Sequence, residues 1–231
     1  MCFRPKARPP GSRSSSPTGS PRCSATANSR SRWAATPERE PERWRVFLAI
    51  DLPDGLRANL KPPIEGLQPL HDWIRTNDVE RIHLTLHFLG HLPVQTVEDL
   101  QPQIRPVVAA HRGFRLTAAG VGAFPNMGRA QVLWAGIGGA DLAQLTGLQV
   151  GVSEVLRTAG IALEDRFHPH LTLARVRRPI RGPSRKLLAD WHSRWREASF
   201  GEIDVTDVRL IRSQLGSGPA RYTTVATFSL Q

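Results

Sequence analysis

A four-residue motif, His-Leu-Thr-Leu, occurs twice in this chain, at 83–86 and again at 170–173. Both copies lie in short apolar stretches of the kind that form β-strands. Because successive side chains of a strand point to opposite faces, each copy predicts one face with an imidazole and a hydroxyl and one with two leucines. The chain must therefore fold so that two strands each bury their leucines and keep their polar pair accessible.

The segments around the two motifs follow a similar order of strand, helix and motif strand. Apolar and β-branched runs bounded by glycine or proline predict strands at 44–53, 82–90, 114–124, 130–138, 170–176, 202–213 and 221–230. Apolar spacing of three and four residues predicts helices at 55–69, 93–111, 140–159 and 184–191. We expect Asp54 to cap the first helix, Pro62 and Pro63 to break or bend it, Gly90 to end the second strand and Gly160 to end the third helix.

This repetition indicates an internal duplication of an α+β unit. The predicted fold is α+β and bilobal, with two lobes related by a pseudo-twofold axis. Each lobe is expected to be an antiparallel sheet with helices on its outer face, and a central cleft separates the lobes. The predicted domain covers residues 44–231.

The first 43 residues differ in composition from the rest. They are rich in Ser, Pro, Gly and Arg, lack a hydrophobic period, and predict a disordered basic tail. The whole chain has a formal net charge of +11, which fits an anionic partner such as RNA but also follows from an arginine-rich genome.

Composition also indicates the cellular compartment of the protein. No apolar run approaches the ~18 residues of a membrane span, and no secretory h-region is present near the start. An organellar transit peptide stays conceivable from the Arg and Ser bias. The two cysteines, Cys2 and Cys23, form neither a disulfide framework nor a zinc-type spacing, so a cytoplasmic protein is expected.

Two imidazoles and two hydroxyls facing one cleft suit the cleavage of a phosphodiester. A neutral imidazole can take a proton from a nucleophile while a protonated imidazole gives one to the leaving oxygen. Threonine hydroxyls can donate to the non-bridging phosphate oxygens, where charge accumulates. Strand alternation puts His87 and His168 on the faces of their motif histidines, which would suggest zinc. Strand residues four apart are about 13 Å apart, however, and no cysteine or close set of carboxylates completes a ligand shell. We therefore expect no metal and no cofactor.

Several stretches resemble a known family, the two-histidine (2H) phosphoesterases, and within it the RNA 2′,3′-cyclic phosphodiesterases, also called 2′-5′ RNA ligases. They are the two motifs and their flanks, "RVFLAIDLP", "HLTLHFLG", "GVGAFPN", "HPHLTLARV" and "SQLGSGPARYTTVATFSL", and the resemblance runs from about Trp44 to Leu230.

The resemblance implies hydrolysis of RNA 2′,3′-cyclic phosphate ends to 2′-phosphates, with His83 as proton donor and His170 as proton acceptor. It further implies that Thr85 and Thr172 bind the phosphate, that Arg175 contacts it and that Phe88 stacks on a base. Strict alternation would put Phe88 and Arg175 on the wrong face, a conflict that a β-bulge would remove. The expected partner is RNA with a cyclic phosphate end, such as a tRNA fragment, and the expected state is a monomer.

Other interpretations remain open at this point. A related 2H enzyme could act on a small cyclic nucleotide or cyclic phosphate, and the motifs could capture an RNA end without turnover. Reversal of the reaction would give 2′-5′ ligation. The arginine-rich run 175–186 could guide an RNA backbone or form a solvated loop. Trp134, Trp191 and Trp195 are expected in the core.

Overall fold

The computed structural model describes residues 41–231 except 165, 217 and 219. The predicted tail at 1–43 lies almost wholly outside this part, so the tail and the domain bounds stay predictions. Four α-helices are described, α1 (Asp54–Glu65), α2 (Val94–Ala109), α3 (Leu142–Thr158) and α4 (Pro183–Trp195), and three short 3-10 turns, η1 (Gln68–Leu70), η2 (Val79–Arg81) and η3 (Met127–Arg129). The strands are β1 (Arg43–Ile50), β2 (Ile74–Thr76), β3 (Leu84–Pro93), β4 (Phe114–Phe124), β5 (Val132–Gly138), β6 (His170–Val176), β7 (Ser199–Val205), β8 (Asp207–Gln214) and β9 (Arg221–Ser229).

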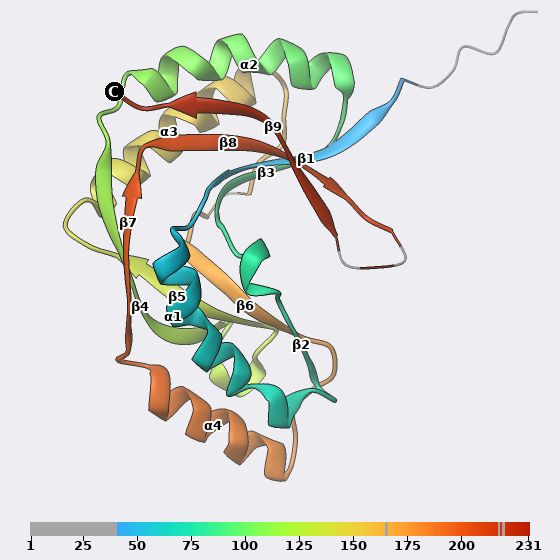
Figure 1. The fold of residues 1–231 in the computed structure, drawn as a ribbon. Coiled ribbons are helices and arrows are strands. Elements are labelled where there is room, and N and C mark those ends of the chain that lie inside the picture. Colours follow the sequence, from blue (N-terminus) through green and yellow to red (C-terminus); the bar gives the residue numbers. More distant parts are fainter. Residues whose placement is uncertain (1–40, 165, 217, 219) are drawn as a thin grey trace, which may run out of the picture. The chain divides into compact units, whose positions relative to one another are not determined.

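The strands form one strongly curled antiparallel sheet in the order β7-β4-β5-β6-β3-β1-β8-β9, with β2 added beside β6 (Figure 1). This order is symmetric about the boundary between β6 and β3. Each side begins with a motif strand, β6 or β3. Next comes the strand that lies before it in the sequence with a helix between them, β5 or β1, and then two further strands. The predicted pseudo-twofold fold is therefore confirmed, although the two lobes share a continuous sheet.

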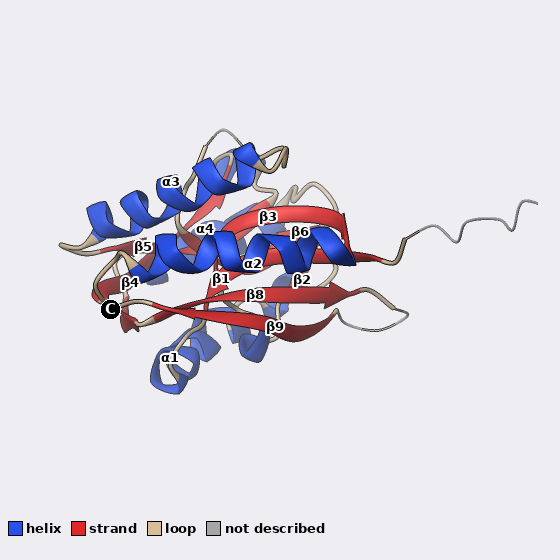
Figure 2. Cartoon of the chain, turned by 90° about the horizontal axis from the view of Figure 1, so that it is seen from above, coloured by secondary structure: helices blue, strands red, loops and turns tan. Residues whose placement is uncertain are grey.

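Each lobe is assembled from both halves of the sequence. One lobe holds β1, β3, β8 and β9 and is covered by α2 and α3, which lie side by side (Figure 2). The other lobe holds β4, β5, β6 and β7, and α1 and α4 pack on it. Thus α1 follows β1 in the chain yet covers the opposite lobe, and α3 crosses over in the reverse direction.

The motif leucines form part of the core, as alternation predicts. Leu84, Leu86, Leu171 and Leu173 are all buried, within a cluster that also holds the apolar stripes of the helices. Trp191 belongs to this core and donates from its indole nitrogen to the carbonyl of Pro63, at 2.8 Å. No helix among the described residues combines the length and apolar character that a membrane span requires.

Some predicted bounds are wrong, for local reasons. The stretch 202–213 was expected to be one strand, but it forms the end of β7 and most of β8, which lie in different lobes. Thr206 separates them, and nothing in the apolar pattern marks this change of lobe. The expected strand end at Gly90 is also wrong, since β3 continues to Pro93 and keeps pairing with β1.

The start of α1 also differs from the prediction. Pro53 occupies the N-cap position, and Asp54 lies in the first turn, where its carboxylate is favoured by the helix dipole without capping by its side chain. Pro62 and Pro63 lie inside the last turn, and the helix ends at Glu65 rather than at 69. The third helix ends as predicted, with Gly160 just beyond it at φ 77°.

Candidate active site

The two motifs meet at the boundary between the lobes. β3 and β6 pair through a single antiparallel partner pair, Leu84 with Leu171. His83 and Thr85 flank Leu84, and His170 and Thr172 flank Leu171, so strand alternation puts the four polar side chains on the face opposite the two buried leucines. The duplication thus brings two His/Thr pairs into one site.

Both imidazoles are oriented by the same kind of backbone contact. Nδ1 of His83 lies 2.9 Å from the carbonyl oxygen of Arg81, and Nδ1 of His170 lies 2.7 Å from the carbonyl oxygen of His168. A carbonyl oxygen only accepts, so Nδ1 carries the proton and donates in both rings. Each Nε2 is consequently left free of these backbone contacts and can serve as a base when neutral or as an acid when protonated.

The environment keeps both histidines neutral in the free protein. Burial lowers the pKa of His83 from 6.5 to about 4, and the Arg81 carbonyl and the charge of Asp51 offset part of that effect. Burial also lowers the pKa of His170. The hydrogen bond to the His168 carbonyl raises that pKa in part, and the positive charge of Arg175 lowers it further. Ligand-free protein therefore presents two uncharged imidazoles at neutral pH.

A β-bulge in β3 changes the face of Phe88 and His87. Ala49 pairs with Thr85 and Leu48 pairs with His87, so Leu86 is an extra residue opposite β1. The bulge shifts the alternation by one residue, and Leu86 and His87 are both buried. Phe88 is instead 47% exposed and shares a cavity with Thr85 and His170. The predicted conflict at Phe88 is removed by a bulge.

His87 does not share the face of His83, and that expectation is wrong. Its side chain is buried, and its Nε2 lies 3.0 Å from the carbonyl oxygen of Gln149 and 3.3 Å from the hydroxyl of Ser153, both on α3. The ring therefore joins β3 to the covering helix. The residue thus has a structural contact with α3, and it also borders the cavity beside His170.

The second motif contains an equivalent bulge. Trp134 pairs with Thr172 and Leu133 pairs with Ala174, which leaves Leu173 as the extra residue. Leu173 and Ala174 are both buried, so alternation resumes with Arg175 on the face of Thr172. Arg175 is exposed, and its charge acts on the pKa of His170. Phe88 and Arg175, each five residues after its motif histidine, occupy equivalent positions in the two repeats.

Aromatic rings flank both histidines. Phe47 stacks on His83 with ring centroids 4.6 Å apart, and Tyr222 of β9 lies edge-on to His83 at 5.5 Å. Phe124 meets His170 edge-on at 5.0 Å. A cavity of about 220 Å³ opens beside His170, and its walls include Phe88, Phe124 and Phe167. The site therefore has apolar walls next to the polar face, which accounts for the lowered pKa values.

The chain segment before His83 is held by a buried arginine. Arg57 is 7% exposed and donates to the carbonyl oxygens of Leu52, Val79 and Ile82, at 3.2, 3.0 and 3.1 Å, and to the carboxylate of Asp51. Asp51 also accepts from Arg209 at 2.5 Å. Because Ile82 immediately precedes His83, this cluster fixes the entry of the first motif.

The sequence matches the family described as the 2′-5′ RNA ligase superfamily over residues 57–216, more than half of the chain. The chain belongs to this superfamily. A protein named RNA 2′,3′-cyclic phosphodiesterase from Archaeoglobus fulgidus is 33% identical over 171 residues, 74% of this chain and 92% of that protein. A protein of the same name from Thermus thermophilus is 30% identical over 192 residues, 81% of this chain and 90% of that protein.

Solved structures share the fold. E. coli LigT complexed with 3′-AMP superposes with a TM-score of 0.65 at 26% identity, covering 82% of this chain and 99% of that one. A solved structure from Thermus thermophilus gives a TM-score of 0.63 at 30% identity, covering 80% of this chain and 97% of that one. The superfamily resemblance expected from the two motifs is thus confirmed.

The sequence analysis did not predict four residues that contact the motif histidines or hold the chain beside them. They are Phe47, Phe124, Tyr222 and Arg57. The first three lie in stretches quoted above for the resemblance, "RVFLAIDLP", "GVGAFPN" and "ARYTTVATFSL". Their positions there were a usable signal. Arg57 carried none, since an arginine in an amphipathic helix normally faces solvent. Among the described residues, no group of three or more His, Cys, Asp or Glu side chains is arranged to hold a metal ion.

Acidification is expected to destabilise this superfamily member. Folding lowers the pKa of His83, His87 and His170, so the unfolded chain binds more protons than the folded chain below its ordinary histidine pKa of 6.5. The contribution of these histidines to the free energy of unfolding is fully present above about pH 6.5. It is lost as the pH falls from there toward about 4. Thermal unfolding followed by circular dichroism should show a constant Tm from about pH 8 to 7 and a falling Tm from about 6.5 to 5. A His83→Asn variant should fall less steeply, and a wild-type Tm that stays level down to about pH 5 would contradict the expectation.

Proposed function

We propose that this protein hydrolyses the 2′,3′-cyclic phosphate at the end of an RNA to a 2′-phosphate, using two histidines and no metal. The observation that carries the proposal is the matched orientation of His83 and His170. Each donates from Nδ1 to a backbone carbonyl, and each presents Nε2 on the face that carries the motif threonines. The names of the Archaeoglobus and Thermus relatives support the same activity.

The reaction needs one proton acceptor and one proton donor. Nε2 of His170 takes a proton from water as the water oxygen attacks phosphorus. The bond from phosphorus to the 3′ oxygen breaks, and the protonated Nε2 of His83 gives its proton to that oxygen. The product carries a phosphate on the 2′ oxygen. Before the next turnover His170 releases one proton to solvent and His83 takes one up, so the two rings exchange no net proton with solvent.

The lowered pKa of His83 is compatible with its role as donor. In the free protein its ring is neutral at neutral pH, because burial lowers its pKa to about 4. A cyclic phosphodiester brings a negative charge to the site, and an opposite charge within ~4–6 Å raises the pKa of an imidazole. Substrate binding is therefore accompanied by uptake of a proton at His83.

The remaining site residues bind the substrate. Thr85 and Thr172 donate hydroxyl hydrogen bonds to the non-bridging oxygens, and Arg175 adds a forked positive charge on the same face. Phe88 offers an exposed ring beside the cavity, which fits a stacked base. The LigT structure with 3′-AMP shows that a protein of this fold binds a nucleotide with phosphate on its ribose. Running the same steps backwards would join a 2′-phosphate end to a 5′ hydroxyl.

Product analysis tests this function. The purified protein is incubated with an oligonucleotide ending in a 2′,3′-cyclic phosphate, with and without EDTA, and the products are compared with 2′- and 3′-phosphate standards. We expect only the 2′-phosphate, formed at the same rate with EDTA. A 3′-phosphate product would contradict the assigned donor and acceptor, and a rate abolished by EDTA would contradict the metal-free mechanism. Rapid turnover of a small cyclic nucleotide together with no turnover of the oligonucleotide would favour the small-molecule alternative.

A further inference from the structure

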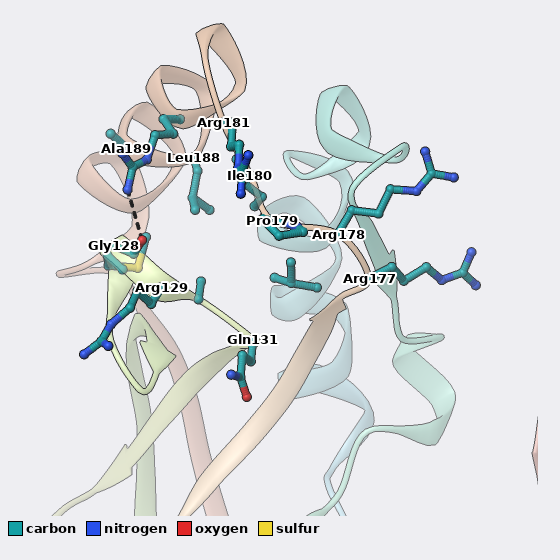
Figure 3. Close-up of a pocket in the computed structure, with 14 residues that line it drawn as sticks. Gly128, Arg129, Gln131, Arg177, Arg178, Pro179, Ile180, Arg181, Leu188 and Ala189 are labelled. Atoms are coloured by element: carbon teal, nitrogen blue, oxygen red, sulfur yellow. Dashed lines mark hydrogen bonds between the residues drawn. The ribbon is translucent and has the colours of Figure 1, made fainter. Parts of the chain in front are cut away.

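A second cavity, of about 600 Å³, lies at the far end of β6 from His170. It is enclosed by η3 and the residues after it, by the connection from β6 to α4, and by α4 itself (Figure 3). Its lining combines apolar side chains with five arginines. The apolar residues include Met127, Val176, Ile180 and Leu188, and the arginines are Arg129, Arg177, Arg178, Arg181 and Arg185.

The positive charges around this cavity are not neutralised by acidic side chains of the described residues. No described Asp or Glu lines the cavity, and none of the five arginines forms an ion pair with a described carboxylate. Arg185 donates to the carbonyl oxygen of Gly128 at 3.1 Å, which joins α4 to η3 across the cavity. In Figure 3 the side chain of Arg129 extends outward from one side of the cavity, and those of Arg177 and Arg178 extend outward from the other side. Concentrated like charges of this kind favour an anionic ligand.

Two further arginines lie close to this cavity, at the end of β6 that is far from His170. β6 runs from His170 to Val176, which corresponds to about 20 Å of strand. Arg175 lies on the site face near the end of that path, and Arg75 of β2 is its direct partner in the neighbouring strand. Two like charges directly opposite each other destabilise a sheet unless an anion lies between them. The positive charge is therefore concentrated at the end of β6 that lies next to the cavity.

We propose that this arginine-lined cavity, together with Arg75, binds the single-stranded RNA chain that precedes the cyclic phosphate end. A 2′,3′-cyclic phosphate closes the 3′ end, so the RNA can continue from the site only in its 5′ direction. Guanidinium groups bind its phosphates, and the apolar floor accommodates the faces of its bases. At a rise of about 3.4 Å per stacked nucleotide, the path of about 20 Å corresponds to about six nucleotides. The inference rests on the proposed function and makes an RNA oligomer, rather than a cyclic mononucleotide, the preferred substrate.

The test compares two substrates and two charge-matched variants. The cavity variant carries Arg129→Ala, Arg178→Ala and Arg181→Ala, and the control carries Lys61→Ala, Arg112→Ala and Arg157→Ala, three exposed cations outside the cavity. The substrates are a ten-nucleotide RNA with a 2′,3′-cyclic phosphate end and a 2′,3′-cyclic mononucleotide. For the cavity variant we expect kcat/KM to fall at least about tenfold on the ten-nucleotide RNA and to change less than about twofold on the mononucleotide. The control should resemble the wild type on both.

Salt dependence gives a second readout. A single-stranded ligand contributes a slope of about −0.7 per phosphate contact in a plot of log affinity against log salt. Binding is measured by fluorescence anisotropy with a ten-nucleotide RNA that ends in a 3′ hydroxyl. This RNA has no cyclic phosphate for the protein to hydrolyse. Removing three contacts should make the slope shallower by about two units, and the Tm of each variant checks that it is folded.

The outcomes separate the two proposals. Equal losses on both substrates, equal losses in the control, or an unchanged salt slope would overturn the RNA-binding role of the cavity. If the wild type turns over neither substrate, the proposed function fails. The anisotropy measurement then still decides whether the cavity arginines bind RNA.

Discussion

His170→Ala is expected to lower kcat on a 2′,3′-cyclic phosphate by about 10²- to 10⁴-fold, and His83→Ala to lower it by a similar factor. Each change removes the only ring that offers Nε2 for its proton transfer, while the backbone carbonyl that oriented the ring can turn to water. The two effects should not multiply in the double variant, because proton removal and proton donation belong to one displacement.

The matched control is His91→Ala. His91 lies on the same strand as the first motif, is exposed, and contacts Arg43 through its backbone carbonyl only. Its replacement should leave kcat within a factor of about two. Initial rates for the wild type, the two single variants, the double variant and His91→Ala, with circular dichroism spectra to confirm folding, provide the measurement. Full activity in either His83→Ala or His170→Ala would rule out the two-histidine mechanism.

Arg57→Met is expected to lower the free energy of unfolding by about 3 to 5 kcal/mol. The substitution keeps the apolar stem of the side chain but removes the donors to three backbone carbonyls and to the Asp51 carboxylate. Those acceptors stay buried or partly buried and lose their partner. We expect kcat to fall as well, because the carbonyl of Ile82 helps to place His83.

Arg209→Met separates the loss of buried contacts from the loss of charge. Arg209 also pairs with Asp51, but about a third of its side chain is exposed, so its removal should cost about 1 kcal/mol or less. Urea denaturation followed by fluorescence measures both variants against the wild type. Similar losses in the two variants would show that the hydrogen bonds to the carbonyls contribute little.

The polar face of the site was predictable because it depends on strand alternation over only three residues. Between His83 and Thr85, and between His170 and Thr172, no bulge intervenes, so the pattern and the structure agree. Beyond the threonines the prediction failed for His87 and met a conflict at Phe88 and Arg175. A bulge depends on how the neighbouring strand accommodates the extra residue, and no local composition in "LTLHF" or "LTLAR" indicates one.

The sequence predicted that there are two lobes, but it did not predict which helices cover each lobe. Repetition of the motif implied two related units, but the helices α1 and α3 each cover the lobe that does not contain the preceding strand. Amphipathic spacing shows that a helix has an apolar face without showing which sheet receives it. The same holds for 202–213, whose alternation continues across Thr206 while the chain passes from one lobe to the other.

The pairing of β1 between β3 and β8 has a consequence for the order of folding. β1 begins at Arg43, and its second partner begins at Asp207, so the lobe that carries His83 lacks its outer strands β8 and β9 until nearly all of the chain is available. Contacts that distant in sequence form slowly, because a long loop must close before any pairing energy is gained. During synthesis, the strand of the first motif can pair with β1 early, but β1 has no partner on its other side until the last strands emerge. Catalytic competence is acquired late, in one step with the completion of the sheet.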